Sequence, residues 1–189
     1  APDALERGLA AARLPGRWEP MPDSRPRVII DGAHNPEKAA ALAATLRTER
    51  ARTGLPKPML LLGLLGAKDA SSIIAALAPE AGGIVVTAPS VVGKPALAPS
   101  ALAAAIQSAS FAGELQIEPE PLAALAAAET FARAEETRVV VAGSLYLAGA
   151  IRNRWFPVDE IVIQRTSWPR REPAAVISAE RGAARLPDS

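Results

Sequence analysis

Five short, largely apolar runs occur along the chain, each followed by a longer stretch whose apolar residues recur with helical spacing. The runs are typical of strands buried on both faces, and they occupy residues 27–30, 59–62, 83–87, 115–118 and 138–142. Strands that alternate with amphipathic helices over short connections favour a parallel sheet with helices on both faces. We therefore expect an α/β, Rossmann-like fold with a mostly parallel sheet of about five or six strands.

Breaks in this pattern suggest how the chain is divided. Residues 3–13 have helical spacing and end at Pro15-Gly16, so we interpret residues 1–13 as the end of a preceding domain or its linker helix. Residues 14–157 then form the Rossmann-like domain, with a short edge strand at 18–21. Residues 158–163 are interpreted as a further edge strand, and the rest of the segment 158–189 as a poorly ordered tail.

The stretch Arg27–Leu46 joins a predicted strand to a predicted helix through the polar turn DGAHNP. Asn35 is a preferred N-cap and Pro36 suits the first helical position. The turn holds Asp31 and His34 where free backbone N–H groups point outward at the carboxyl end of a parallel strand. This arrangement favours an anionic ligand. Equally, Asp31 and Asn35 can simply cap the turn, and His34 can fill a surface niche.

Other polar residues are predicted at the same sheet edge. Arg17 follows Pro-Gly and presents a planar guanidinium that suits phosphoryl oxygens, although a salt bridge explains it as well. Lys68 follows the second strand and is therefore expected near the cleft. Alternatively, Lys68 and Asp69 form a solvated ion pair in which Asp69 is the N-cap of the next helix. Ser144 starts the last helix, where capping is the simpler role. Tyr146 is interpreted as a packing residue.

Composition narrows the choice of function. The chain has 189 residues, 21 basic and 20 acidic ones and a net charge of +1, which does not indicate nucleic acid or an anionic membrane as a partner. Cysteine is absent, and no His/Asp/Glu cluster predicts a closed metal site, so we assign no metal ligands. Neither a signal peptide nor a transmembrane run is recognisable, which favours the cytoplasm. Phosphate-binding motifs of the types GxxxxGK[ST] and GxGxxG are missing too.

Taken together, the strings LPGRWE, VIIDGAHNP, LLGLLGAKD and VVVAGSLYLAGAIR resemble the C-terminal domain of folylpolyglutamate synthase/dihydrofolate synthase, in the Mur ligase superfamily. The resemblance covers residues 3–156. It implies an ATP-driven ligase in which a folate or dihydropteroate carboxylate becomes an acyl phosphate that L-glutamate then attacks. ATP and Mg²⁺ are the implied cofactors, with the metal ligands and the P-loop in a separate N-terminal ATPase domain of the same polypeptide.

The resemblance also implies roles for particular residues. Arg17 is similar to an arginine that contacts ATP phosphates, and Asp31 to an aspartate that holds the ribose. His34 is similar to a histidine near the transferred phosphoryl group and the incoming glutamate, and Ser144 to a serine at the glutamate site. We add Asn35 and Lys68 to the cofactor-binding set. Ala67 stands where relatives usually have an acidic residue.

Two alternatives remain open at this point. The chain could instead be the C-terminal domain of a muramyl-peptide ligase, although the GSLYL string favours the folate branch. It could also be a stand-alone, non-catalytic module that binds a nucleotide or another ligand. If it is the ligase domain, we expect the chain to be a monomer and to be inactive by itself, because the P-loop is missing.

Overall fold

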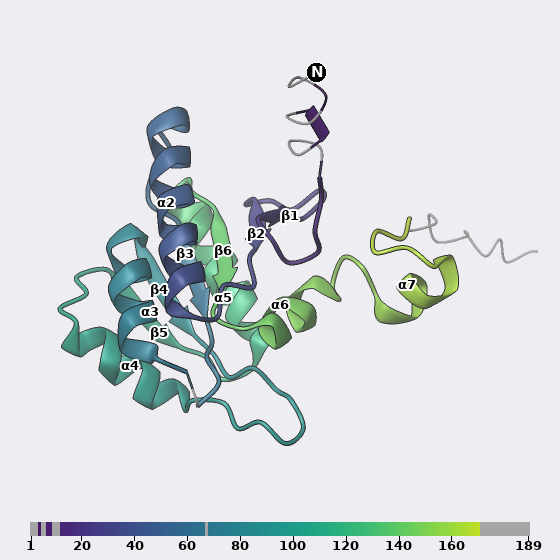
Figure 1. The fold of residues 1–189 in the computed structure, drawn as a ribbon. Coiled ribbons are helices and arrows are strands. Elements are labelled where there is room, and N and C mark those ends of the chain that lie inside the picture. Colours follow the sequence, from purple (N-terminus) through teal and green to yellow (C-terminus); the bar gives the residue numbers. More distant parts are fainter. Residues whose placement is uncertain (1–3, 5–6, 9–11, 67, 171–189) are drawn as a thin grey trace, which may run out of the picture.

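The computed structural model describes residues 4, 7–8, 12–66 and 68–170 (Figure 1). In this part of the chain one sheet has the strand order β1-β2-β6-β3-β4-β5, and only the β1/β2 pair is antiparallel. The strands are β1 (Glu19–Pro20), β2 (Val28–Ile30), β3 (Met59–Leu62), β4 (Gly83–Val86), β5 (Glu114–Ile117) and β6 (Val139–Ala142). This sheet of six mostly parallel strands confirms the expected fold class.

Helices cover both faces of the sheet (Figure 1). They are α2 (Pro36–Thr53), α3 (Ala70–Leu77), α4 (Pro99–Ser108), α5 (Pro121–Ala134) and α6 (Leu145–Arg152), with a 3₁₀ turn at Ala78–Glu80. Helix α7 (Val158–Gln164) follows α6 and lies away from the sheet. Successive strand residues point to opposite faces, so Val140 joins the core under α2, α3 and α4, whereas Val139 and Val141 join the core under α5 and α6. Polar loops therefore gather at the strand ends.

Helix α2 begins as its sequence predicts. The Asn35 side chain accepts a hydrogen bond from the Lys38 N–H at 2.9 Å, and Pro36 occupies the first turn. One apolar stripe then faces the sheet, formed by Ala39, Leu42, Ala43 and Leu46. The cap fixes the start of the helix directly after the DGAHNP turn.

We expect Asn35→Ala to lower the free energy of unfolding by about 1 kcal/mol, because the Lys38 N–H loses its acceptor. Urea unfolding followed by circular dichroism measures the effect. Asn153→Ala, which removes the acceptor of the Val158 N–H at the start of α7, is the comparison variant for the loss of a helix cap. An Asn35→Ala chain as stable as wild type would contradict the capping role.

The edge strand expected at residues 158–163 is wrong, because Val158–Gln164 forms helix α7. Asn153 Oδ1 accepts a hydrogen bond from the Val158 N–H at 2.9 Å, and the acidic residues Asp159 and Glu160 lie in the first helical turn, where the helix dipole favours them. This cap and the acidic first turn favour a helix over the expected strand.

Part of the expected tail is well placed against the domain. Trp168 Nε1 donates to Glu19 Oε1 at 2.8 Å, and the Ser167 carbonyl accepts from Arg152 Nη2. The poorly ordered tail is thus a wrong prediction for these residues, while the stretch 171–189 lies outside the described residues, as do most of the helix expected at 3–13 and Ala67. None of the described helices is long and apolar enough to span a membrane.

Candidate functional site

The carboxyl ends of β2, β6, β3 and β4 follow one another in the sheet, and the loops that leave them surround a cavity of about 220 Å³. It is lined by His34, Leu65, Lys68, Lys94, Gly143, Ser144, Leu145 and Tyr146. Three residues predicted separately from the sequence, His34, Lys68 and Ser144, therefore meet at one place. Asp31 and Asn35 belong to the neighbouring turn but do not line this cavity.

Asp31 holds the turn after β2 in place. Its Oδ1 accepts a hydrogen bond from the Ala33 N–H at 2.8 Å, and its Oδ2 accepts one from the Trp18 N–H at 2.9 Å. The second bond ties the Arg17 loop to the turn. Each carboxylate oxygen can accept a further hydrogen bond, so this structural role leaves room for a ligand hydroxyl.

The hydrogen bonds of His34 assign its tautomer. Nδ1 lies 2.7 Å from the Gly32 carbonyl oxygen, which can only accept, so Nδ1 carries the proton. Lys38 Nζ lies 3.3 Å from Nε2 and can donate to its lone pair. The imidazole is thus fixed at one nitrogen by the backbone, and the other nitrogen is an acceptor beside an ammonium group.

Gly143 and Ser144 shape the turn between β6 and α6. Gly143 has a φ of +101°, which side-chain-bearing residues rarely adopt, and its N–H donates to the Ala33 carbonyl at 2.7 Å. Ser144 is 2% exposed, and its Oγ accepts from the Tyr146 N–H at 3.1 Å. The predicted capping role of Ser144 is therefore present, and its hydroxyl proton remains available at the cavity.

Sequence reasoning missed Lys94 and misassigned Tyr146. Lys94 Nζ donates to Tyr146 Oη at 2.9 Å and lies 5.3 Å from the centre of its ring. Tyr146 is 39% exposed, so it is not the packing residue that we expected. The position of Tyr146 two residues after Ser144 was a usable signal, whereas Lys94 lies in the loop between β4 and α4, where the pattern carries no information.

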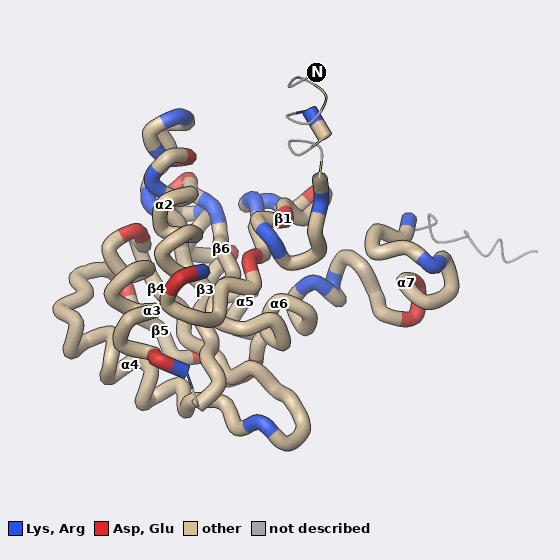
Figure 2. The backbone as a smooth tube through the Cα atoms, in the orientation of Figure 1, with Lys and Arg blue, Asp and Glu red and all other residues tan. Residues whose placement is uncertain are grey.

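The cavity is positively charged. Lys68 and Lys94 line it together with His34, and none of its lining residues is acidic. In Figure 2 the long loop between β4 and α4 carries blue for a basic residue and no red for an acidic one. Asp69 caps α3 instead: hydrogen bonds from the Ser72 N–H and the Ser71 hydroxyl lower its pKa. The arrangement is suited to a small anion.

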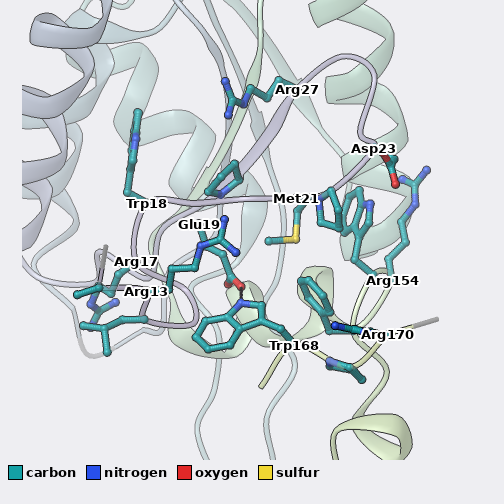
Figure 3. A pocket seen from close by; sticks show the side chains of 17 residues that line it. Arg13, Arg17, Trp18, Glu19, Met21, Asp23, Arg27, Arg154, Trp168 and Arg170 are labelled. Carbon is teal, nitrogen blue, oxygen red and sulfur yellow. Dashed lines mark hydrogen bonds between the residues drawn. The ribbon is translucent and has the colours of Figure 1, made fainter. Parts of the chain in front are cut away.

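Arg17 faces a different and larger cavity of about 1190 Å³, shown in Figure 3, which none of the other predicted site residues lines. Its Nη1 donates to the Gly16 carbonyl at 3.1 Å and lies beside Gly32, where an added Cβ would approach it to 2.7 Å. Leu145, which lines the smaller cavity, lies beside the same glycine. Arg17 is thus close to the DGAHNP turn without sharing the cavity.

Glu19 holds the Arg17 loop in place through hydrogen bonds to its carboxylate. Its carboxylate accepts hydrogen bonds from the Gly16 N–H at 2.8 Å, from Arg152 Nε at 2.9 Å and from Trp168 Nε1 at 2.8 Å. Burial acts to raise the pKa of Glu19, but these hydrogen bonds and the Arg152 charge outweigh it and keep the pKa below its ordinary value. Figure 3 shows the Trp168 ring against this carboxylate.

Metal ligands are not gathered anywhere in the described residues, where no group of three or more His, Asp or Glu side chains could hold an ion. The chain has no cysteine either. A divalent cation would therefore need most of its ligands from other groups.

The family described as dihydrofolate synthetase, C-terminal domain, matches residues 16–154. The chain belongs to this family. The match begins at the Arg17 loop and ends at the close of α6, so it includes every residue that lines the smaller cavity.

Individual relatives agree with the family. The dihydrofolate synthase/folylpolyglutamate synthase of Mycobacterium tuberculosis is 47% identical over 88 residues, which are 45% of this chain and 17% of that protein. Crystal structures of the M. tuberculosis folylpolyglutamate synthase complexed with ADP and AMPPCP align with a TM-score of 0.68 and 34% identity, covering 82% of this chain and 35% of that one. Escherichia coli FolC in complex with DHPP and ADP aligns with a TM-score of 0.64 and 25% identity, covering 88% and 36%. This chain thus spans about a third of the length of these solved relatives.

Proposed function

We propose that this chain is the C-terminal domain of an ATP-dependent ligase that adds L-glutamate to folates or dihydropteroate. The observation that carries the proposal is the cavity where His34, Lys68 and Ser144 meet without any acidic lining residue. Such a site attracts a small carboxylate, and the relatives named above are a dihydrofolate synthase/folylpolyglutamate synthase and a folylpolyglutamate synthase. Residues 14–157 form the ligase domain in this proposal, and the preceding residues connect it to an ATPase domain.

The chemistry gives this domain a positioning role. A folate or pteroate carboxylate oxygen bonds to the γ-phosphorus of ATP, and ADP leaves; the amine of glutamate then attacks the acyl carbon, and phosphate leaves. Charge spreads over phosphoryl oxygens in the first step, so a cation such as Arg17 stabilises it, while Asp31 has acceptor capacity left for a ribose hydroxyl. Asn35 and Lys68 complete the proposed nucleotide contacts.

His34 and Ser144 act on the glutamate side in this proposal. His34 Nε2, which faces Lys38 Nζ in this structure, can orient the attacking amine when the amine takes the place of that ammonium, and the Ser144 hydroxyl can donate to a carboxylate. Closure of the ATPase domain over this edge of the sheet would exclude water that hydrolyses the acyl phosphate. Mg²⁺ would be held largely by that second domain, because the described residues offer no cluster of ligands. We further infer a cytoplasmic monomer that is inactive without the ATPase domain.

His34→Ala is expected to lower kcat/KM for ligation at least about tenfold, because the reacting amine loses an orienting acceptor. The measurement is ATP- and Mg²⁺-dependent attachment of L-glutamate to dihydropteroate and to tetrahydrofolate by the complete gene product that contains this chain. Glu37→Ala, at an exposed position of the same helix turn, is the matched control. Unchanged activity of the His34 variant would leave the histidine as a purely structural residue.

The same assay tests the family-level alternatives. Absence of ligation with any folate or pteroate, together with ligation of amino acids to UDP-linked sugar peptides, would favour a muramyl-peptide ligase. Absence of both activities would favour a ligand-binding module without catalysis. Vigorous ATP hydrolysis by this chain alone would contradict the need for a separate ATPase domain.

A further inference from the structure

Lys94 and Tyr146 form a pair at the mouth of the small cavity that the proposed function has not used. The contact joins the loop between β4 and α4 to the first turn of α6, across 52 positions in the chain. A lysine ammonium donates three hydrogen bonds, of which Tyr146 Oη takes one. The remaining N–H groups of Lys94 are available to a ligand in the cavity, which Lys94 and Tyr146 both line.

The size and charge of the cavity limit what it can hold. A volume of about 220 Å³ suits a free amino acid, with a larger substrate reaching only the rim of the cavity. Lys68 and Lys94 line it, and none of the other lining residues is acidic, so the ligand is an anion. An amino acid with two carboxylates fits both limits better than one with a neutral side chain.

Strand order places Lys94 at the far end of the site. Arg17 precedes β1, His34 follows β2, and Lys94 follows β4, and the sheet order from β1 to β4 is β1-β2-β6-β3-β4. Strands β6 and β3 lie between β2 and β4, so His34 and Lys94 approach the same small cavity from opposite sides. The phosphoryl group and the reacting amine belong near Arg17 and His34. The part of the amino acid that reaches Lys94 is therefore the part farthest from the amine.

We propose that Lys94, with Tyr146 beside it, binds the side-chain carboxylate of the incoming amino acid and thereby selects glutamate over glutamine. This inference rests on the proposed function of the cavity. Lys94 makes no bond to the reacting atoms; it neutralises a charge that glutamine lacks. Tyr146 orients the Lys94 ammonium through its hydroxyl and its ring, so the two residues together recognise the carboxylate at the end of the substrate side chain.

The test is a titration of this chain with L-glutamate and, separately, with L-glutamine, followed at the amide resonances of Gly143 and Tyr146 by NMR. Lys94→Met is expected to weaken glutamate binding about tenfold and to leave glutamine binding unchanged, because only glutamate presents a charge to the lysine. Lys94→Arg should retain most of the affinity, and Tyr146→Phe should lose less than Lys94→Met. Lys57→Met, an equal charge change at an exposed position before β3, is the control.

Three results would overturn the inference: equal affinities of wild type and Lys94→Met for glutamate, an equal loss for both amino acids, or cavity amides that do not respond to L-glutamate. The ligation assay separates this outcome from the proposed function. If the Lys94→Met enzyme still ligates glutamate with an unchanged KM, the role of Lys94 is contradicted and the proposed function still stands. If glutamate binding depends on Lys94 but the complete gene product has no ligation activity, the proposed function is contradicted and the glutamate site at Lys94 is still supported.

Discussion

Glu19→Gln is expected to lower the free energy of unfolding by about 3–5 kcal/mol, the cost of leaving a buried charge without its partner. Glu19 and Arg152 are each 7% exposed, and the glutamate receives both Nε and Nη2 of the arginine. A neutral amide of the same shape keeps the packing but leaves the Arg152 charge uncompensated. It also weakens the bonds from the Gly16 N–H and Trp168 Nε1, which hold the Arg17 loop and the segment after α7.

The pH dependence of this contribution has a definite sign. The folded-state pKa of Glu19 is below the ordinary value of 4.5, so folding favours the ionised carboxylate. The stabilisation is complete above the unfolded-state pKa and is lost as the pH falls through that value and then through the folded-state pKa. In Glu19→Gln this part of the acid destabilisation should be missing, so the curves of stability against pH for the two proteins converge below pH 4.5.

Urea unfolding between neutral and acid pH measures both effects. Asp23→Asn removes an equal charge from an exposed residue that lines the same large cavity, and it should change stability by less than about 0.5 kcal/mol. Glu19→Gln with the stability of Asp23→Asn at neutral pH would show that the Glu19–Arg152 pair adds nothing. If the difference in stability between wild type and Glu19→Gln stayed constant down to acid pH, the proposed titration of Glu19 would be contradicted.

Gly143→Ala is expected to cost about 2–5 kcal/mol, from a strained backbone and from overpacking. The φ of +101° is unfavourable for alanine, and the new Cβ would lie 2.5 Å from the Gly63 carbonyl oxygen and 3.0 Å from Leu62 Cδ1. The Gly63 oxygen belongs to the backbone just after β3 and cannot move aside as a flexible side chain can. The turn that positions Ser144 would therefore shift together with the end of the sheet.

Two other glycines provide matched alanine controls. Gly149 lies in α6 with no neighbour within 4 Å of an added Cβ, so Gly149→Ala should stabilise the chain by about 0.5–1 kcal/mol. At Gly32 the nearest atoms are the ends of the Leu145 and Arg17 side chains, which can move, so the cost there should be smaller than at Gly143. Thermal unfolding of the three variants checks this order. A Gly143 variant as stable as wild type would refute the close approach.

Much of the fold could be predicted from the sequence because its units are local. The strand at Met59–Leu62 and the helix starts after Asn35, Asp69 and Ser144 were predicted at their observed positions. Each of these caps acts within three residues along the chain. The prediction for 158–163 failed because its β-branched residues favour a strand, whereas Asn153 and the acidic first turn support a helix that no single-residue propensity reveals.

Only part of the candidate site could be predicted from the sequence. His34, Lys68 and Ser144 follow strand ends, so a parallel sheet necessarily brings them to one edge. Arg17 was assigned to the same site but lines another cavity, although the antiparallel pairing of β1 with β2 brings it to the same edge of the sheet. Lys94 went unnoticed because the path of a loop of ten or so residues cannot be inferred from its composition.

The sequence by itself determined the alternation of strands and helices, the polar turn at Asp31 and His34, and the caps that start the helices. These features depend on hydrogen bonds and apolar spacing within a few residues. The tertiary structure alone decided the pairing of Glu19 with Arg152, 133 positions away, and of Lys94 with Tyr146, 52 positions away. Such contacts exist only after the sheet has set the distances between distant segments, and they form the charged networks on which the stability and the proposed specificity of this protein depend.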